Sequence, residues 1–563
     1  MTSDIHGAIR PIDYHTNAPR REGLAMLSSL IARERERAPE LLLIDNGDLL
    51  QGSPLASYAA AFTGQQEVHP FISVLNELRY DAAVIGNHEF NYGLPLLRKA
   101  ALDSRFPWLS ANIVAAKEQP LAGEQTLSVD PLPRVEHANK PKEDDAESTR
   151  SSVLPMPAKG LSPAFGPPYL IKTLSSGVKV ALLGVTTHYI PNWELPGHIE
   201  GLTFLDALET VRSWVAYIRK HEQPDVLAVS YHGGFERDLQ SGEPTERLTG
   251  ENQGYAMCTE IEGIDVLLTG HQHRRLTGEI NGVTIVQPGV SGASCGRISI
   301  QLEKCEGERW RIVKKEARLL DASSEGNSPD NTVLELTEES EAAAQAWLDQ
   351  PIGVLEGDLS VDDPLSLRLK EHPFMAFVHQ VQMEATGAEL SNAAFLSEQG
   401  GGFSGSITIR DISSNFIYPN TLAVLRLSGR DIKEALEQSA RYFTLNDAGD
   451  IEVHPDYLRP KPQHYNYDMW GGIHYELNIA KPPGSRVAKL ERDGEPLDMN
   501  RSYSVVMNNY RASGGGDYTM YVGKPVLHEG ADDMAALVER YIRKHQPLAV
   551  PKAGNWRVTA SRD

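Results

Sequence analysis

Seven side chains in the first half of this sequence could together hold metal ions. In chain order the candidate ligands are Asp4, His6, Asp48, Asn87, His232, His271 and His273. Each one, taken alone, is more simply a polar loop residue, but five separate occurrences of the same pattern favour a metal centre. Imidazole and carboxylate groups with one amide suit transition metals better than calcium. We expect two divalent ions, drawn from Mn, Zn, Fe, Co or Mg, in an arrangement suited to phosphoester hydrolysis.

Buried strands are the elements that would bring these side chains to one place. Short apolar runs predict strands at 41–44, 81–85, 178–185, 226–230, 264–269 and 283–289, and helical spacing predicts helices at 23–37 and 71–78. Most of the candidate ligands directly follow such a strand. Open α/β sheets carry their sites past the carboxyl ends of the strands, so these side chains are expected to meet there. Asp4 and His6 would share one face of an extended segment, because they are two residues apart.

The composition describes an ordinary protein with more than one domain. At 563 residues the chain is too long for a single hydrophobic core. No run approaches the ~20 apolar residues of a membrane span. A net charge of -22 argues against a nucleic-acid polymer or an anionic membrane as a partner. The three cysteines lack paired spacing and predict neither a zinc site nor a disulfide framework.

Three stretches of the second half combine aromatic residues with asparagine and aspartate. They lie at 415–422, 465–468 and 508–517. Flat aromatic faces can stack on a nucleobase, at about 1–3 kcal/mol per base. Amide and carboxylate groups nearby can bind base edges or ribose hydroxyls. The alternative for Tyr465 and Tyr467 is that they are core aromatics beside turns.

The motifs of the first half resemble those of the calcineurin-like metallophosphoesterases. Asp-X-His at 4–6, Gly-Asp at 47–48, Gly-Asn-His-Glu at 86–89, His-Gly-Gly at 232–234 and Gly-His-Gln-His at 270–273 occur in this order. The resemblance implies that one ion is held by Asp4, His6, Asp48 and His273, and the other by Asp48, Asn87, His232 and His271. It also implies that His88 and Asn87 contact the phosphate oxygens, and that His88 stabilises the transition state or the leaving oxygen.

The second half resembles the C-terminal domain of the 5′-nucleotidase family. Within that family, the motifs at 86–93, 418–422 and 508–512 look most like those of 2′,3′-cyclic-nucleotide 2′-phosphodiesterase/3′-nucleotidases. The resemblance implies that two tyrosines clamp the base and that two polar residues help to hold the nucleoside. These substrate-binding residues are Tyr418 and Tyr510 for the clamp, and Asn420 and Asp517 for the nucleoside.

Two positions depart from the plain 5′-nucleotidases. Asn91 stands where that branch has an aspartate three residues after the catalytic histidine. An amide can orient His88 by a hydrogen bond but cannot stabilise an imidazolium by charge. The triple glycine at 400–402 is followed by Phe403, where that branch has an arginine for the phosphate. We therefore expect the metals and His88 to supply most of the phosphate binding.

The expected fold class is α/β (α+β), with two main domains. The resemblance implies a four-layer metallophosphoesterase β-sandwich flanked by helices, followed by a separate C-terminal α/β nucleotide-binding domain. The expected boundaries are 1–325 for the first domain, with a surface insertion at about 115–168, then a linker helix in 326–355, and 356–563 for the second domain. Residues 314–355 show little strand pattern, and 337–347 predict a polar helix.

The expected activity is hydrolysis of nucleotides at a dinuclear metal centre. Opening of a 2′,3′-cyclic nucleotide would give the 3′-nucleotide, and a second cycle would give nucleoside and phosphate, by in-line attack of an activated water. A 5′-nucleotidase or UDP-sugar hydrolase is the alternative enzyme, and a non-catalytic nucleotide-binding protein is an alternative of another class. The expected partners are nucleotide substrates, with no nucleic-acid polymer and no membrane, and the chain is expected to be a monomer.

The start of the sequence bears on location. No signal peptide follows Met1, so the sequence as given predicts a cytoplasmic protein. The resemblance implies a strand of apolar residues directly before Asp4. We therefore predict that Met1 is internal and that the natural protein begins several residues earlier. A signal peptide in that segment would make the protein periplasmic or secreted.

Overall fold

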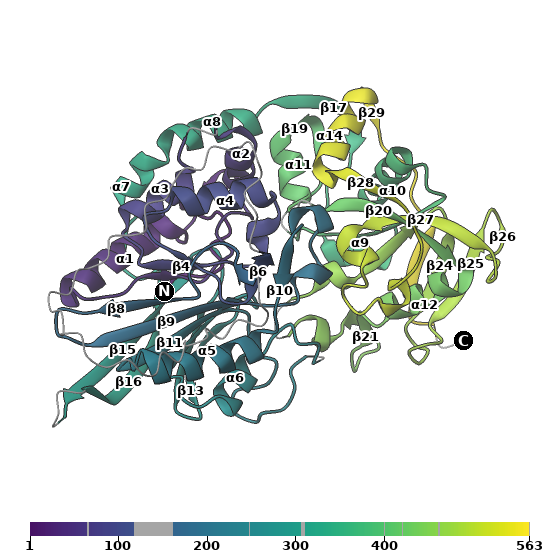
Figure 1. Cartoon of the computed structure of the whole chain (residues 1–563). Helices are drawn as coiled ribbons and strands as arrows, with labels where there is room; N and C mark the ends of the chain where they lie inside the picture. The colour runs from purple at the N-terminus through teal and green to yellow at the C-terminus, as the bar shows by residue number, and fades with distance from the viewer. Residues whose placement is uncertain are drawn as a thin grey trace.

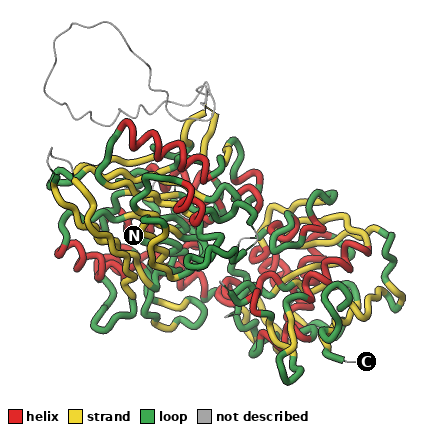
Figure 2. Tube along the Cα trace, turned by 90° about the horizontal axis from the view of Figure 1, so that it is seen from below, coloured by secondary structure: helices red, strands yellow, loops and turns green. Residues whose placement is uncertain are grey.

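The protein has two lobes that follow each other in the sequence (Figure 1). In this computed structural model the first lobe, coloured purple to teal, holds the N-terminus, and the second, green to yellow, ends at the C-terminus. Seen from below, the C-terminus lies at the far end of the second lobe (Figure 2). The structure describes residues 1–64, 67–116, 161–246, 248–305, 310–398, 400–418, 420–459 and 462–561.

Two sheets form the centre of the first lobe. The smaller is parallel and has the order β3 (Ile44–Asp45), β4 (Ala82–Val84), β5 (Trp108–Leu109). Thr2 pairs with Asp45 in a parallel bridge beside β3. The larger has the order β13 (Arg275–Ile280), β14 (Val283–Pro288), β12 (Val266–Thr269), β11 (Val226–His232), β9 (Lys179–Thr186), β8 (Tyr169–Thr173). Its four middle strands run parallel, so their carboxyl ends lie at one edge.

The two sheets stack on each other, so their central strands are buried on both faces. In β4, Ala82 and Val84 belong to the core between the sheets, whereas Ala83 belongs to the core under the first helices. In β11, Ala228 belongs to the core between the sheets and Val229 to the core on the opposite side. Strands covered on both faces read as nearly continuous apolar runs, which is why the sequence predicts them well.

Helices cover the outer face of each sheet. The smaller sheet is covered by α1 (Leu24–Arg37), α2 (Pro54–Phe62), α3 (Pro70–Glu77) and α4 (Leu94–Asp103), and the larger by α5 (Ala207–His221) and α6 (Gly254–Glu260). The order of layers is therefore helices, sheet, sheet, helices. This arrangement confirms the expected α/β fold class of the first lobe.

One expectation about the connecting region is wrong. Residues 314–355 include most of β16 (Trp310–Asp321), which pairs with β15 (Ser294–Lys304) in a long hairpin, and much of β17 (Pro351–Asp358). Charged residues at 311, 314–316, 318 and 321 interrupt the apolar ones along β16, so the strand carries no long apolar run to mark it. The polar helix expected at 337–347 corresponds to α8 (Glu338–Leu348), which follows α7 (Asn331–Leu336).

The expected surface insertion is only partly open to comparison. Residues 117–160 lie outside the described part of the chain. At either side of them, β6 (Ile113–Ala116) and β7 (Leu161–Pro163) pair antiparallel, and β10 (Leu202–Phe204) pairs with β6. Residues 161–163 of the expected insertion therefore belong to a sheet.

The second lobe is built on a mixed five-stranded sheet. Its order is β23 (Asp468–Gly471), β18 (Leu390–Ala394), β27 (Ser502–Asn508), β20 (Thr421–Ser428), β28 (Val526–Asp533). A second sheet has the order β26 (Glu495–Pro496), β25 (Val487–Arg492), β24 (His474–Asn478), β30 (Trp556–Thr559), and β17 pairs with β19 (Ser404–Thr408) and β29 (Leu548–Ala549). The helices are α9 (Pro364–Leu369), α10 (Pro373–Thr386), α11 (Ile409–Asn415), α12 (Gly429–Ala440), α13 (Asn509–Ala512) and α14 (Met534–Lys544). This lobe is the separate C-terminal α/β unit that the sequence predicts.

Polar contacts join the lobes. Arg410 on α11 donates a hydrogen bond to the carbonyl of Tyr14, at 2.6 Å, and forms an ion pair with Asp349. Among the described residues, no helix is both long enough and apolar enough to cross a bilayer.

Candidate metal centre

The candidate ligands meet at one edge of the two sheets. Asp48 follows β3, Asn87 follows β4, His232 ends β11 and His271 follows β12. Two groups of side chains have ligand atoms within 4.8 Å of one another. The first is Asp4, His6 and His273, and the second is Asp48, His232 and His271. The structure thus brings together six of the predicted ligands, and Asn87 lies between members of the second group.

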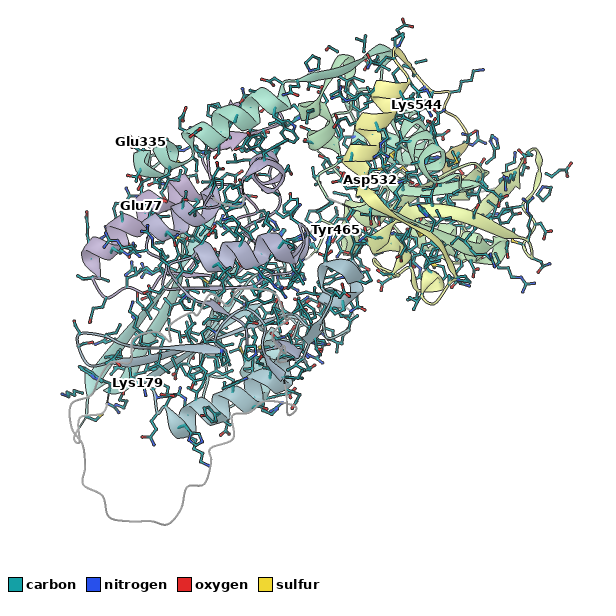
Figure 3. The ribbon with its side chains drawn as sticks, turned by 45° about the horizontal axis from the view of Figure 1, so that its top comes forward. Glu77, Lys179, Glu335, Tyr465, Asp532 and Lys544 are labelled. Atoms are coloured by element: carbon teal, nitrogen blue, oxygen red, sulfur yellow. The ribbon has the colours of Figure 1, made fainter. Side chains whose placement is uncertain are left out.

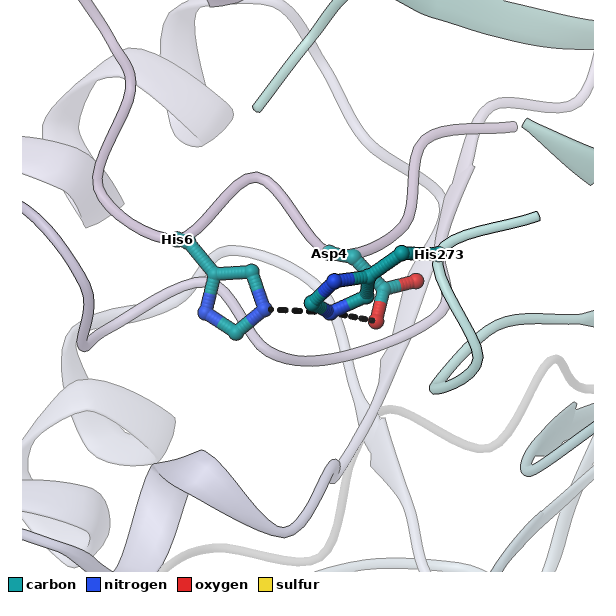
Figure 4. A group of neighbouring side chains, drawn as sticks. All are labelled: Asp4, His6 and His273. Carbon is teal, nitrogen blue, oxygen red and sulfur yellow. Dashed lines mark hydrogen bonds and ion pairs between the residues drawn. The ribbon is translucent and has the colours of Figure 1, made fainter. Parts of the chain in front are cut away.

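In the first group, the three side chains point toward one another (Figure 4). Nε2 of His6 lies 3.1 Å from Nε2 of His273, which is 3.6 Å from Oδ1 of the buried Asp4. Nδ1 of His6 donates to the carbonyl of Gln51, so its Nε2 presents a lone pair to the group. Burial lowers the pKa of His6 to about 4, which keeps the ring neutral and able to bind a cation.

In the second group, Asn87 and Asp48 face the histidines. Oδ1 of Asn87 lies 3.2 Å from Nε2 of His232 and 2.9 Å from Nδ1 of His271. Oδ2 of Asp48 lies 3.1 Å from Nε2 of His232 and 3.8 Å from Nε2 of His6. Asp48 is therefore the carboxylate that lies between the two groups.

The outer nitrogens of these rings are held by hydrogen bonds that fix the ring orientation. Nδ1 of His232 donates to the carbonyl of Asn46 at 2.6 Å, and Nε2 of His271 bonds Oε1 of Glu251 at 2.9 Å. Partners of this kind select the tautomer and turn the free nitrogen toward a metal. Burial raises the pKa of Asp4 to about 7 in the chain alone, and a cation among the ligands would favour the charged carboxylate. This set of donors fits two divalent cations.

The backbone of the ligands differs from the expectation. Asp4 and His6 do not lie on an extended segment, because their φ angles are 53° and 51°. Their N–H groups donate to the carbonyls of Gly47 and Asp48, and these bonds keep the segment beside the loop that follows β3. Positive φ angles are also found at Asp48, His271 and His273. Left-handed backbone at residues other than glycine is costly and clusters at functional sites.

Glu89 is a structural member of the centre to which the sequence assigns no role. Its buried carboxylate accepts four backbone hydrogen bonds, from the N–H groups of Asp48, Leu49, Leu50 and Gly86. A Cβ atom at Gly86 would lie 2.3 Å from Oδ1 of Asp48, so only glycine allows the two loops to approach this closely. Glu89 thereby joins the loop of Asp48 to the turn that carries Asn87. Its place inside the Gly-Asn-His-Glu motif was the available signal.

His88 lies beside the metal groups but belongs to neither. Its backbone N–H donates to Oδ1 of Asp48 at 2.8 Å, and its ring lies 5.1 Å from that of His6, between centroids. Nδ1 of His88 is 2.7 Å from Oδ1 of Asn91, which is the orienting contact that the sequence predicts. His88 is therefore placed to act on a group bound at the metals without holding a metal.

The predicted nucleoside residues fall into different environments. Tyr418, Asn420 and Tyr510 are half-buried, and Tyr510 meets Tyr465 edge to face with ring centroids 6.5 Å apart. Tyr465 lies where the two lobes meet (Figure 3). Tyr467, in contrast, is fully buried and stacks on another core tyrosine. The alternative of a core aromatic therefore holds for Tyr467.

Asp517 lies further out than the tyrosines. It is exposed, has a φ angle of 65° and lines a cavity of about 810 Å³ whose other wall is formed mainly by α12. Phe403, at the position of the missing arginine, is buried in the core and offers no charge.

Three contacts place the stretches predicted to bind the nucleoside against the loops of the candidate metal ligands. Nε2 of Gln51 donates to the carbonyl of Ile417 at 3.4 Å. Nδ2 of Asn509 donates to the carbonyl of Trp193 at 3.4 Å, and Trp193 stacks on His271 with centroids 5.3 Å apart. Ile417, next to Tyr418, thus contacts the loop of the candidate ligand Asp48 directly, and Asn509, next to Tyr510, is joined to His271 through Trp193.

Comparison with known proteins agrees with this geometry. The calcineurin-like phosphoesterase family matches residues 1–275, and the 5′-nucleotidase C-terminal domain matches residues 351–523. A Staphylococcus aureus protein assigned as a 5′-nucleotidase and crystallised with α-ketoglutarate is 32% identical, with a TM-score of 0.84 over 99% of this chain and 98% of that one. The chain belongs to the 5′-nucleotidase family of calcineurin-like phosphoesterases.

Two curated relatives of this 5′-nucleotidase family member show the same extent of similarity. The 2′,3′-cyclic-nucleotide 2′-phosphodiesterase/3′-nucleotidase of Salmonella typhimurium is 27% identical over 99% of the chain and 88% of its own length. A trifunctional nucleotide phosphoesterase of Bacillus subtilis is 27% identical over 99% of the chain, which spans 38% of that relative's length. The family and these relatives are phosphoric ester hydrolases, as the sequence predicts. Calcineurin-like phosphoesterases use two divalent metal ions, in agreement with the two ligand groups.

A first prediction concerns the metal ligands and His88. Asp48→Asn should lower the occupancy of both ions, because the carboxylate between the groups loses its negative charge. His88→Ala should keep both ions and lose activity on the order of 10²-fold, because it removes an interaction with the transition state only. Metal analysis of the purified variants checks both expectations. A fully loaded Asp48→Asn beside a metal-free His88→Ala would reverse the two assignments.

A second prediction concerns Glu89. In Glu89→Gln, the amide nitrogen that replaces one carboxylate oxygen would face two backbone N–H groups. Each of these N–H groups would lose its acceptor, at a cost of about 1–3 kcal/mol. We expect a lower free energy of unfolding and a lower metal content, measured by chemical denaturation and metal analysis. Glu36→Gln, at an exposed position of α1, is the matched control. Equal stability and metal content in the two variants would contradict the role of Glu89.

Proposed function

We propose that the chain hydrolyses 2′,3′-cyclic nucleotides to 3′-nucleotides, and 3′-nucleotides to nucleoside and phosphate. The observation that carries this proposal is the position of the tyrosine-bearing stretches against the metal-binding loops. A nucleotide can then place its base in the second lobe and its phosphate in the first. The motifs shared with the 3′-nucleotidases and the similarity to the Salmonella enzyme favour a phosphate on the 2′ and 3′ oxygens.

Tyr418 and Tyr510 are proposed to bind the base, with Asn420 and Asp517 near the nucleoside. Arg511 supports this region, because its guanidinium is buried, pairs with Asp468 at 2.7 Å and donates to the carbonyl of Tyr465 at 2.9 Å. It also lies 5.5 Å from the ring centroid of Tyr510. The buried ion pair of Arg511 and Asp468 thus supports both Tyr465 and Tyr510.

The chain's own residues divide the chemistry at the phosphate. Asp4, His6, Asp48 and His273 would hold one ion, and Asp48, Asn87, His232 and His271 the other. When bound, such ions lower the pKa of a water molecule and neutralise charge on the phosphate oxygens. Asn87 and His88 are positioned to contact those oxygens. Oδ1 of Asn91 accepts a hydrogen bond from the N–H at Nδ1 of His88, which leaves Nε2 of that ring to face the substrate.

Each cycle exchanges one phosphorus–oxygen bond for another. In the first, a water oxygen bonds to phosphorus, the bond to the ribose 2′ oxygen breaks, and that oxygen takes up a proton. In the second, the bond to the 3′ oxygen breaks in the same way and inorganic phosphate leaves. His88 is proposed to stabilise the transition state or the departing oxygen in both cycles. We also propose the domain division 1–325, 326–355 and 356–563, and that the chain acts as a monomer.

A third prediction decides between the proposed activity and the alternative. The Staphylococcus aureus relative favours a 5′-nucleotidase as the second candidate. With added divalent metal, we expect kcat/KM for 3′-AMP to exceed that for 5′-AMP by roughly tenfold or more, which is about 1.4 kcal/mol of transition-state binding. Phosphate release from the two nucleotides measures this ratio. A preference for 5′-AMP would replace the proposed activity by 5′-nucleotidase, and hydrolysis of neither would favour a binding protein.

A fourth prediction concerns the tyrosines. Tyr418→Ala and Tyr510→Ala should each raise the KM for nucleotides, in line with a stacking energy of about 1–3 kcal/mol per base. Hydrolysis of bis(p-nitrophenyl) phosphate, which has no base, should change little. Tyr510→Phe keeps the ring face and is the matched control. Equal loss on both substrates would show that the tyrosines serve the core.

A further inference from the structure

Glu194 lies behind the residue that orients His88. It follows the short helix η2 (Ile190–Asn192), and its side chain is only 6% exposed. Oε2 accepts a hydrogen bond from Nδ2 of Asn91 at 2.7 Å. Oε1 accepts from the N–H of Leu195 at 2.8 Å and lies 2.9 Å from Nδ1 of His198. One carboxylate oxygen of Glu194 is thus held by Leu195 and His198, and the other binds Asn91.

This contact determines which way the amide of Asn91 points. An amide has a donating and an accepting end of nearly the same shape, so its orientation depends on its partners. An ionised carboxylate can only accept hydrogen bonds, so Nδ2 of Asn91 must face Glu194. Oδ1 then faces His88 and can only accept a hydrogen bond from Nδ1 of that ring.

We propose that Glu194 is a positioning residue for His88 and acts on it through the amide of Asn91. The proposal rests on the proposed function, because it requires that His88 acts on the substrate. The plain 5′-nucleotidases have an aspartate at the position of Asn91. Here the negative charge is on Glu194, which contacts Asn91 and not His88. The neutral amide of Asn91 lies between the two and passes on the orienting effect of Glu194.

The test uses single and double variants of the full chain loaded with metal. In Glu194→Gln, the new amide keeps its oxygen on the N–H of Leu195 and turns its nitrogen toward Asn91. Asn91 must then turn its own nitrogen toward His88, which selects the wrong tautomer of the ring. We expect kcat for 3′-AMP to fall roughly 10–100-fold, the usual effect of losing an outer-shell partner, with KM and metal content unchanged. Glu200→Gln, exposed in the same loop, is the matched control.

The decisive variant is the double exchange Asn91→Asp with Glu194→Gln. Asn91→Asp alone places two carboxylates within 2.7 Å of each other and should also lower kcat. In the double variant the amide of residue 194 can donate to the carboxylate of residue 91, which still accepts from Nδ1 of His88. We expect kcat to recover to within a few-fold of wild type. A role in folding alone would not produce this recovery.

A second comparison shows whether Glu194 acts through His88. In a His88→Ala background, Glu194→Gln should cause no further loss, because residues that act as one unit are not additive. Wild-type kcat in Glu194→Gln, no recovery in the double exchange, or full additivity with His88→Ala would each overturn the role of Glu194 while leaving the proposed function in place. A wild-type chain without activity on any nucleotide would overturn the proposed function itself.

Discussion

The centre of this protein depends on the crowding of electron-pair donors at one edge of two stacked sheets. Carboxylate oxygens, an amide oxygen and imidazole nitrogens converge there, and hydrogen bonds to Asn46, Gln51 and Glu251 occupy the outer nitrogens of three rings. The second nitrogen of each ring is therefore aimed at the other donors of the centre. Such a group is unfavourable in a buried place unless positive charge lies among its members. The need for cations is thus built into the arrangement of hydrogen bonds around the centre.

The sheets and Glu89 resist the relaxation that this crowding would otherwise cause. Five of the candidate ligands have left-handed backbone, at about 1–3 kcal/mol each, and such conformations persist only where the surroundings determine them. Strands β4 and β11 are packed on both faces, so the loops at their ends start from fixed points. Glu89 then binds the backbone of the loops that follow β3 and β4 at once. The rigid layers are what make a costly local geometry possible.

The sequence predicts the local parts of this structure and misses the parts that depend on distant partners. Strands such as β11 and β12 are visible because burial on both faces leaves a continuous apolar run. Strand β16 is interrupted by charged residues and has no such run, so the sequence does not predict it. The turn at Asp4 depends on carbonyl groups of the Asp48 loop, so the spacing of two residues wrongly indicated an extended segment. Glu89 and Glu194 bind groups 41 and 103 residues away. Only the place of Glu89 inside the Gly-Asn-His-Glu motif gives a local signal, and Glu194 has none.

The segment Asn192–Glu194 has neighbours in both lobes. Ser513 donates to the carbonyl of Asn192, Asn509 donates to that of Trp193, and the next residue holds Asn91. Three consecutive residues thus connect the helix that carries Tyr510 with the hydrogen bonds behind His88. Interaction energy gained at a base can in this way be expressed in turnover as well as in affinity. Phosphate esters that lack a base would bind the same ions yet leave this connection unused.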